Sequence, residues 1–420
     1  MSVSKNIGDE IKNNINEDKN LYYKMNQINK DKLKRDDNER RRKRAFGFGV
    51  SLLILLVFAI LNMFSVNFYM IYSKGIKYFR NYLAYIGLAI CFFGAGAFIN
   101  YKFYNKKRIA FIILVGSLGI LLFVLFAAKF LPNLVPKNKG AYGWIKLPGF
   151  TIQPAEFLKL PFIIILARLF ERAEKEKFRN MEIFLYIIPI PVLFGVFIYL
   201  QGDLGTTLHY ICILLFMMFL SKIDMRLIIA VVSAGVVVVS GAFYWIYNFV
   251  DLTGAHFRLR RITSFITGLL TNEYDNAIGY QVGQSLIAFG SGGIIGKNFG
   301  NGVQKYKYLP EVSTDFILAS YGEELGFLGM FILIVLFLVI FNIIKSIAMD
   351  TKDYFGKYLA MGIGGYIITQ VLINIYVALG MLPVFGIPMP IFSYGGSSLV
   401  TVFASLGIIL NINNHKDNRL

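Results

Sequence analysis

Long apolar runs are the feature that most limits what this chain can fold into. Runs of roughly 20 apolar residues recur from residue 46 to the end, a length that spans the hydrocarbon core of a bilayer as an α-helix. Only 16% of the 420 residues are charged, whereas a soluble domain carries about a quarter. A β-barrel would show short alternating segments instead. The sequence therefore predicts an all-α, polytopic membrane protein.

The apolar runs and the charged loops between them predict a topology. We expect ten spans, at residues 46–66, 82–100, 109–130, 153–170, 182–200, 204–220, 226–248, 315–342, 357–380 and 396–412. With the N-terminus inside, the densely charged loops YKFYNKKR, ERAEKEKFRN, SKIDMR and KSIAMDTKDYFGKY are cytoplasmic, as the positive-inside rule requires. An even number of spans places the C-terminus inside too. Residues 45–412 are then the transmembrane domain, between cytoplasmic tails at 1–44 and 413–420.

The net charge of +18 invites a nucleic-acid-binding interpretation, which the charge distribution argues against. The basic residues cluster between apolar runs, where membrane topology and anionic lipid account for them. Residues 1–44 are polar and predict a disordered or loosely helical tail, and its last residues, RRRKR at 40–44, anchor the first span. Cys91 and Cys212 lie inside apolar runs, and the three histidines show no metal-ligand spacing.

Two segments predicted to lie outside are more than connectors. Residues 131–152 contain KNKGAYGWIKLPGF, and residues 249–314 form a large extracytoplasmic loop with a further apolar stretch, GYQVGQSLIAFGSGGIIG, of re-entrant or interfacial character. The first carries lysines, and the second carries lysines and arginines, on the side that topology disfavours. Ordinary loop solubility explains these residues, and so does an anionic ligand.

Several polar residues lie at span boundaries, and each has a structural and a functional interpretation. Glu156 falls in the first turn of the fourth span, where Lys159 at i+3 can pair with it or point at a phosphate-bearing headgroup. Trp144 is either an interfacial anchor or a ring exposed to a groove. Asp203 is either a helix cap or an active-site acid.

The stretch YLPEVSTDFILASYGEELG raises the same choice for Asp315. Ser313 or Thr314 can cap the eighth span, which would place Asp315 in its first turn, where acids are favourable. The same position is the right depth for a base that acts on a lipid headgroup. On a helix, at most one of Glu323 and Glu324 shares the side of Asp315. Three prolines in GMLPVFGIPMPIFSYGGSSL forbid a continuous helix further along, which suggests a broken segment facing a cavity.

These motifs, in this order, resemble those of the SEDS proteins, the family of RodA, FtsW and SpoVE. The resemblance rests on GWIKLPGFTIQPAEFLKL, QGDLGTTL, the long motif from Gly279 to Gly329 and LPVFGIPMPIFSYGGSSL, and it covers residues 46–412. It implies a ten-span bundle that polymerises lipid II into peptidoglycan in division, elongation or sporulation. It also implies a class B penicillin-binding transpeptidase as partner, in a bacterial cell membrane.

The resemblance also implies residue roles. Asp315 matches the essential acid of the TDF motif, and Trp144, Glu156 and Lys159 fall in other functional motifs. We further predict substrate contacts from Arg258, Gln281, Lys305 and Ser393, with Asp203 and Glu323 as other candidate acids. The chain departs from the family at Gly202, where Pro is usual, and at Ser313, where His is frequent.

The resulting hypothesis is that Asp315 deprotonates the 4-hydroxyl of the acceptor sugar, which attacks the donor carried on undecaprenyl pyrophosphate. Lys159 and the outer arginines, or a divalent cation such as Mg²⁺ or Mn²⁺, would stabilise the pyrophosphate. Two alternatives stay open: a lipid II flippase without bond chemistry, and a non-catalytic scaffold for a transpeptidase.

Overall fold

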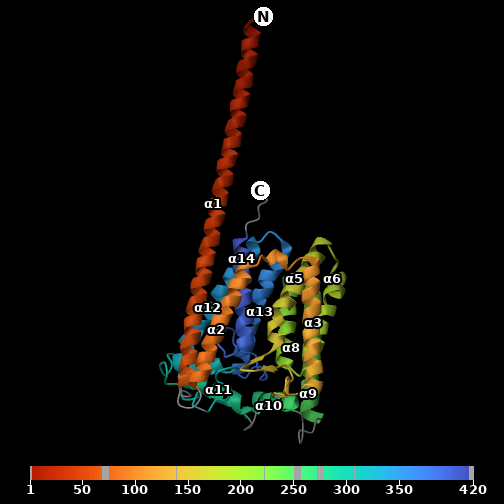
Figure 1. Cartoon of the computed structure of the whole chain (residues 1–420), viewed down its shortest axis with the longest axis vertical. Coiled ribbons are helices and arrows are strands. Elements are labelled where there is room, and N and C mark those ends of the chain that lie inside the picture. Colours follow the sequence, from red (N-terminus) through yellow and green to blue (C-terminus); the bar gives the residue numbers. More distant parts are fainter. Residues whose placement is uncertain are drawn as a thin grey trace. The chain divides into compact units, whose positions relative to one another are not determined.

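The computed structural model describes residues 2–68, 75–138, 140–221, 223–249, 257–271, 274, 279–306 and 308–415. Helices dominate these residues (Figure 1), so the all-α prediction is confirmed. The strands in this part of the chain are β1 (Ile145–Leu147) and β2 (Phe150–Ile152), which pair antiparallel. The chain forms two compact units, Met1–Val50 and Ser51–Leu420, and helix α1 (Ser2–Phe68) contributes to both.

The first unit consists of the N-terminal part of α1. Two ion pairs at i,i+4 spacing stabilise it, Asp37 with Arg41 and Glu39 with Lys43. In both, the acid is N-terminal to the base, the better orientation on a helix. The expected domain boundaries at residues 44 and 412 remain predictions.

Each predicted span coincides with a helix or a pair of helices. After α1 come α2 (Gly75–Phe98), α3 (Lys107–Phe130), α4 (Pro154–Phe157), α5 (Lys159–Lys175), α6 (Asn180–Ile187), α7 (Pro189–Leu200), α8 (Leu204–Phe219), α9 (Met225–Phe249), α10 (Phe257–Thr271), α11 (Gly279–Gly292), α12 (Ile317–Asp350), α13 (Tyr354–Ala378) and α14 (Gly396–Asn414). In the described residues, seven helices are long and apolar enough to cross a membrane. α8 and the first half of α9 are shorter apolar helices. The chain is a multi-pass membrane protein.

The helices differ in how much of their surface the protein covers. In the most apolar window of α13, 72% of residues are buried, and in α14 78%, against 22% in α2, α3 and α12. Accordingly α13 and α14 run through the middle of the second unit, with α3 and α6 towards one edge (Figure 1). The outer helices expose apolar side chains, which suits contact with lipid.

Helix α12 is broken at Gly326, and the loop after α11 fills the break. Gly326 has φ 65° and ψ −165°, a conformation open to glycine and costly for other residues. The freed backbone groups pair with the loop: Lys297 N–H donates to the Glu323 carbonyl at 3.0 Å, and Phe327 N–H donates to the Gly293 carbonyl at 2.9 Å. Non-helical backbone at this depth is tolerable because protein satisfies it.

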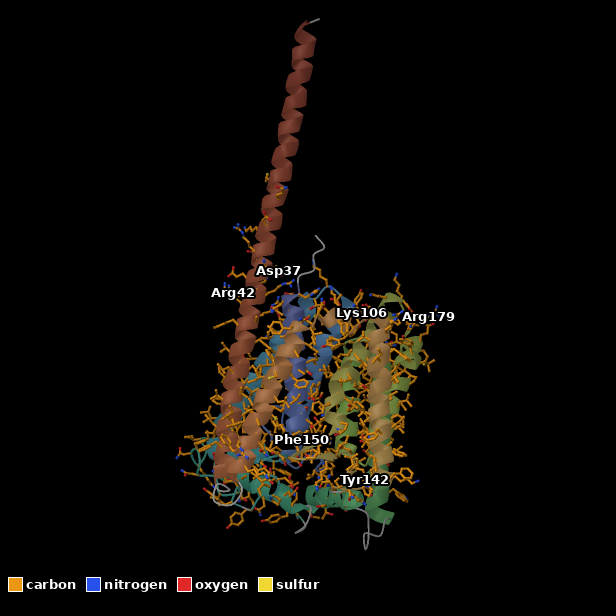
Figure 2. All side chains as sticks on the ribbon, in the orientation of Figure 1. Asp37, Arg42, Lys106, Tyr142, Phe150 and Arg179 are labelled. Carbon is orange, nitrogen blue, oxygen red and sulfur yellow. The ribbon has the colours of Figure 1, made fainter. Side chains whose placement is uncertain are left out.

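The two ends of the bundle separate the loops as the sequence predicted. Lys106 and Arg179, from two of the charged loops, lie at one end, and Tyr142 and Phe150 lie at the other (Figure 2). Helices α10 and α11, from the long outer segment, also lie at the second end (Figure 1). The segments expected outside thus share one end of the second unit.

Candidate functional site

A cavity of about 300 Å³ lies at the end of the bundle that carries the β1–β2 hairpin. Its wall combines the hairpin, the first turns of α4 and α8, helix α10, the turn before α12 and the loop between α13 and α14. Its charged lining residues are four carboxylates and one guanidinium: Glu156, Asp203, Glu311, Asp315 and Arg261. Trp144 lines it as well.

Asp315 lies in a tight turn before α12, not in the helix. The prediction that Ser313 or Thr314 caps this helix is wrong, because α12 begins at Ile317 and its N-cap is Phe316, with no side-chain cap hydrogen bond. Helical-wheel angles measured from Asp315 therefore do not apply. The half-buried Asp315 side chain lines the cavity.

Distant segments hold the backbone of this turn. Ser393 Oγ donates to the Thr314 carbonyl at 2.5 Å, and Tyr394 N–H donates to the Ser313 carbonyl at 2.8 Å. Asn374 of α13 donates to the Asp315 carbonyl at 3.0 Å. Ser393 was predicted to bind substrate, but it is 3% exposed and lies behind the turn. Its contacts fix the position of Asp315.

Asp203 is both a helix cap and a cavity residue. It is the N-cap of α8, and its carboxylate accepts from Thr206 N–H at 2.9 Å and Thr206 Oγ at 2.8 Å. Gln153 Nε2 donates to the same carboxylate at 2.7 Å. Burial raises the pKa of the Asp203 carboxyl above its ordinary value, and the Thr206 hydrogen bonds oppose this shift. The two interpretations of Asp203 are compatible.

Gly202 explains one departure from the family pattern. Its φ of 88° is inaccessible to proline, whose ring fixes φ near −65°. Its N–H also donates to the Tyr199 carbonyl at 2.9 Å, and proline has no N–H to donate. The turn before Asp203 therefore has a backbone conformation that requires glycine.

The predicted ion pair between Glu156 and Lys159 forms, with 2.5 Å between Nζ and Oε1. The Lys159 side chain is 0% exposed, is not among the cavity-lining residues and lies 5.7 Å from the centre of the Tyr366 ring. Only Glu156 reaches the cavity wall. The Lys159 charge is therefore neutralised behind the wall, a poor position for binding pyrophosphate directly.

Arg261 supplies positive charge at the wall. It lies on α10, is half-buried, and its charge interacts favourably with Asp315 and Asp203. Burial lowers the pKa of the Arg261 guanidinium, and the two carboxylates oppose the shift, so it stays charged at neutral pH. Arg261 was not among the predicted site residues, because no local pattern distinguishes it from the other arginines of the outer loop. The predicted Arg258 has a side chain outside the described part of the structure.

The remaining predicted residues lie away from the cavity. Glu323 is 0% exposed, lies 2.8 Å from Lys297 Nζ and accepts from Gln304 N–H at 2.9 Å. Lys305 is 2.6 Å from Glu324, which also accepts from Ser65 Oγ at 2.7 Å. These two pairs join α1, α12 and the loop after α11. Gln281 lies half-buried on α11, also outside the cavity lining.

Metal binding needs converging ligands, and in the described residues no three His, Cys, Asp or Glu side chains form such a group. The four carboxylates share one cavity, but no three of them come together at one point. These residues do not fit a cation site made by protein ligands alone.

Comparison with known proteins gives a consistent result across the chain. Residues 44–418 match the FtsW, RodA and SpoVE family model, described as a cell cycle protein. The probable peptidoglycan glycosyltransferase FtsW of Geobacter sp. strain M18 is 32% identical over 378 residues, which cover 87% of this chain and 96% of that protein. Stage V sporulation protein E of Bacillus subtilis strain 168 is 32% identical over 373 residues, covering 86% and 97%.

Two solved structures share the fold. A chain of a peptidoglycan synthase complex that coordinates polymerization and crosslinking superposes with a TM-score of 0.70 at 21% identity, covering 88% of this chain and 97% of that chain. The rod shape determining protein RodA of Thermus thermophilus superposes with a TM-score of 0.60 at 21% identity, covering 88% and 96%.

Proposed function

This chain belongs to the FtsW, RodA and SpoVE family of cell cycle proteins, and we propose that it is a peptidoglycan glycosyltransferase that polymerises lipid II at the cavity around Asp315. We assign the reaction to this cavity because of the position of Asp315. Its carboxylate lines the cavity, and three hydrogen bonds, from Asn374, Ser393 and Tyr394, hold the backbone of the turn at residues 313–315. A rigidly held carboxylate is suited to proton abstraction from a bound hydroxyl.

In the proposed reaction, Asp315 accepts the proton of the 4-hydroxyl of the acceptor GlcNAc. That oxygen attacks the anomeric carbon of the donor from the face opposite the leaving group. The new glycosidic bond forms as the bond to the pyrophosphate oxygen breaks, and the electron pair leaves with undecaprenyl pyrophosphate. The anomeric configuration is inverted.

Arg261 is the cavity residue best placed to meet the departing pyrophosphate. Guanidinium binds phosphate oxygens through two parallel hydrogen bonds. Its interaction with Asp315 and Asp203 holds it at the wall before substrate arrives. Lys159 then acts indirectly, because it fixes the Glu156 carboxylate at the cavity edge.

In the described residues no three carboxylates converge, so a divalent cation in this cavity would need oxygen ligands from the substrate beside those of the protein. The proposed orientation is that both termini are cytoplasmic and the cavity faces outward, where lipid II and a class B transpeptidase partner would meet it. Helix-rich architecture suits a flippase or a scaffold equally well, so polymer synthesis is the deciding measurement.

The test is glycan polymer formation by the purified chain with its transpeptidase and lipid II. Because Asp315 is no helix cap, Asp315→Asn leaves the described backbone contacts intact and removes the proton acceptor. Polymerisation should fall by about 10²-fold or more, with expression and partner binding unchanged. Asp36→Asn, an exposed position in the first unit, is the matched control. Near-normal polymer from Asp315→Asn would exclude Asp315 as the base, and no polymer from the unsubstituted chain would favour the flippase or scaffold.

A further inference from the structure

Glu311 has a strained backbone in the turn that presents Asp315. Its φ is 55°, in the left-handed region that side chains with a Cβ adopt at a cost. The turn requires this conformation, since the Glu311 carbonyl accepts from Thr314 N–H at 3.0 Å and from Phe316 N–H at 3.3 Å. Glycine would form the same turn without strain. Strained residues of this kind concentrate at functional sites, so the Glu311 side chain is a candidate for a functional role.

The other described non-glycine residues with positive φ are Lys177, Asn298 and Ile391. Lys177 follows Glu176, the C-cap of α5, at the position where left-handed backbone commonly ends a helix. Asparagine tolerates the conformation well. None of these three lines the cavity, whereas Glu311 does.

The Glu311 side chain is oriented by its own turn. Thr314 Oγ donates to Glu311 Oε2 at 3.0 Å, and the Thr314 carbonyl is in turn held by Ser393. Glu311 and Asp315 are therefore two carboxylates on one short turn that hydrogen bonds hold in place, and both line the same cavity.

A carboxylate accepts hydrogen bonds and repels phosphate, so Glu311 is suited to a hydrogen-bond donor such as a sugar hydroxyl and not to the pyrophosphate. The cation for the pyrophosphate, Arg261, comes from a different element, α10. We propose that Glu311 binds the acceptor sugar, accepting a hydrogen bond from a second hydroxyl beside the one that Asp315 deprotonates. This inference rests on the proposed function and adds a specificity-determining residue for the acceptor.

The competing explanation is that Glu311 only forms the turn. The Glu311→Gly variant distinguishes this explanation from acceptor binding. If only the turn matters, glycine should preserve polymerisation, because it relieves the strain and keeps both hydrogen bonds to the carbonyl. If Glu311 binds the acceptor, the variant should melt no lower than the unsubstituted chain, yet its KM for lipid II should rise about tenfold or more. Lys177→Gly is the matched control, with the same relief of φ at a site outside the cavity, and should polymerise normally.

Glu311→Gln keeps the backbone strain and one acceptor oxygen but removes the charge. If Glu311→Gly fails to fold, this second variant decides, and a raised KM at unchanged melting temperature supports acceptor binding. A normal KM for lipid II in a folded Glu311→Gly protein would overturn the inference. If the glycine variant does not fold, a normal KM in Glu311→Gln would overturn it. Either result would leave the assignment of Asp315 unaffected. Absence of polymer from the unsubstituted complex would overturn the proposed function and the inference with it.

Discussion

Lys159 Nζ lies 2.5 Å from Glu156 Oε1, and neither side chain is more than 3% exposed. Removing one partner of such a pair leaves a buried charge without compensation, which is far more costly than losing an exposed pair. The pair also links α5 to the cavity wall, because Glu156 lines the cavity and Lys159 does not. The stability of the fold and the shape of the site thus depend on the same contact.

Lys159→Met should lower the free energy of unfolding by about 3–5 kcal/mol, because Glu156 would remain buried and unpaired. Thermal melting of the purified protein measures the loss. Arg172→Met, which breaks an i,i+4 pair with Glu176 whose side chains are 58% and 42% exposed, should change stability little. A stable Lys159→Met protein with weakened lipid II binding would instead support direct contact between Lys159 and substrate.

Gly202→Pro, which introduces the usual family residue, should destabilise this chain. Even Gly202→Ala should cost about 1–2 kcal/mol, because φ is positive there, and proline additionally loses the N–H bonded to Tyr199. Melting temperatures of both variants provide the measurement, with Gly116→Ala on α3 as a control that should be neutral or stabilising. A proline variant as stable as the parent would mean that this turn readily adopts a second conformation.

Ser393→Ala should lower kcat while leaving the KM for lipid II unchanged. The substitution removes a donor to the Thr314 carbonyl and an acceptor for Met389 N–H at 2.7 Å, with a stability cost of about 1–3 kcal/mol. Ser405→Ala, where a buried hydroxyl only bonds back to its own helix, is the control. Raised KM at full stability would restore the prediction that Ser393 contacts substrate.

The proposed orientation predicts opposite labelling at the two ends of the bundle. In a chain whose Cys91 and Cys212 are replaced by Ala, Phe150→Cys should react with an impermeant thiol reagent in intact spheroplasts, because Phe150 is 47% exposed at the hairpin end (Figure 2). Lys106→Cys should react only after permeabilisation. Labelling in the reverse order would place Asp315 in the cytoplasm and contradict extracellular polymerisation.

The sequence by itself determined the features that depend on local spacing. Apolar runs located a helix, or a pair of helices, at each of the ten predicted spans, and the i,i+3 spacing predicted the pair of Glu156 with Lys159. The cap at Asp203 and the break before α14, with its three prolines, followed from local backbone preferences. Each signal lies within a few residues of the structure it specifies.

Only the tertiary structure decided the arrangement around Asp315. Ser393 and Asn374 lie far along the chain from the turn, and their hydrogen bonds favour a turn where local propensity favoured a capped helix. Likewise, Lys297 pairs with Glu323 and removes it from the candidate acids, while α10 brings Arg261 to the cavity. Long-range contacts of this kind leave no periodicity in the sequence, because they depend on which helices the packed core places side by side.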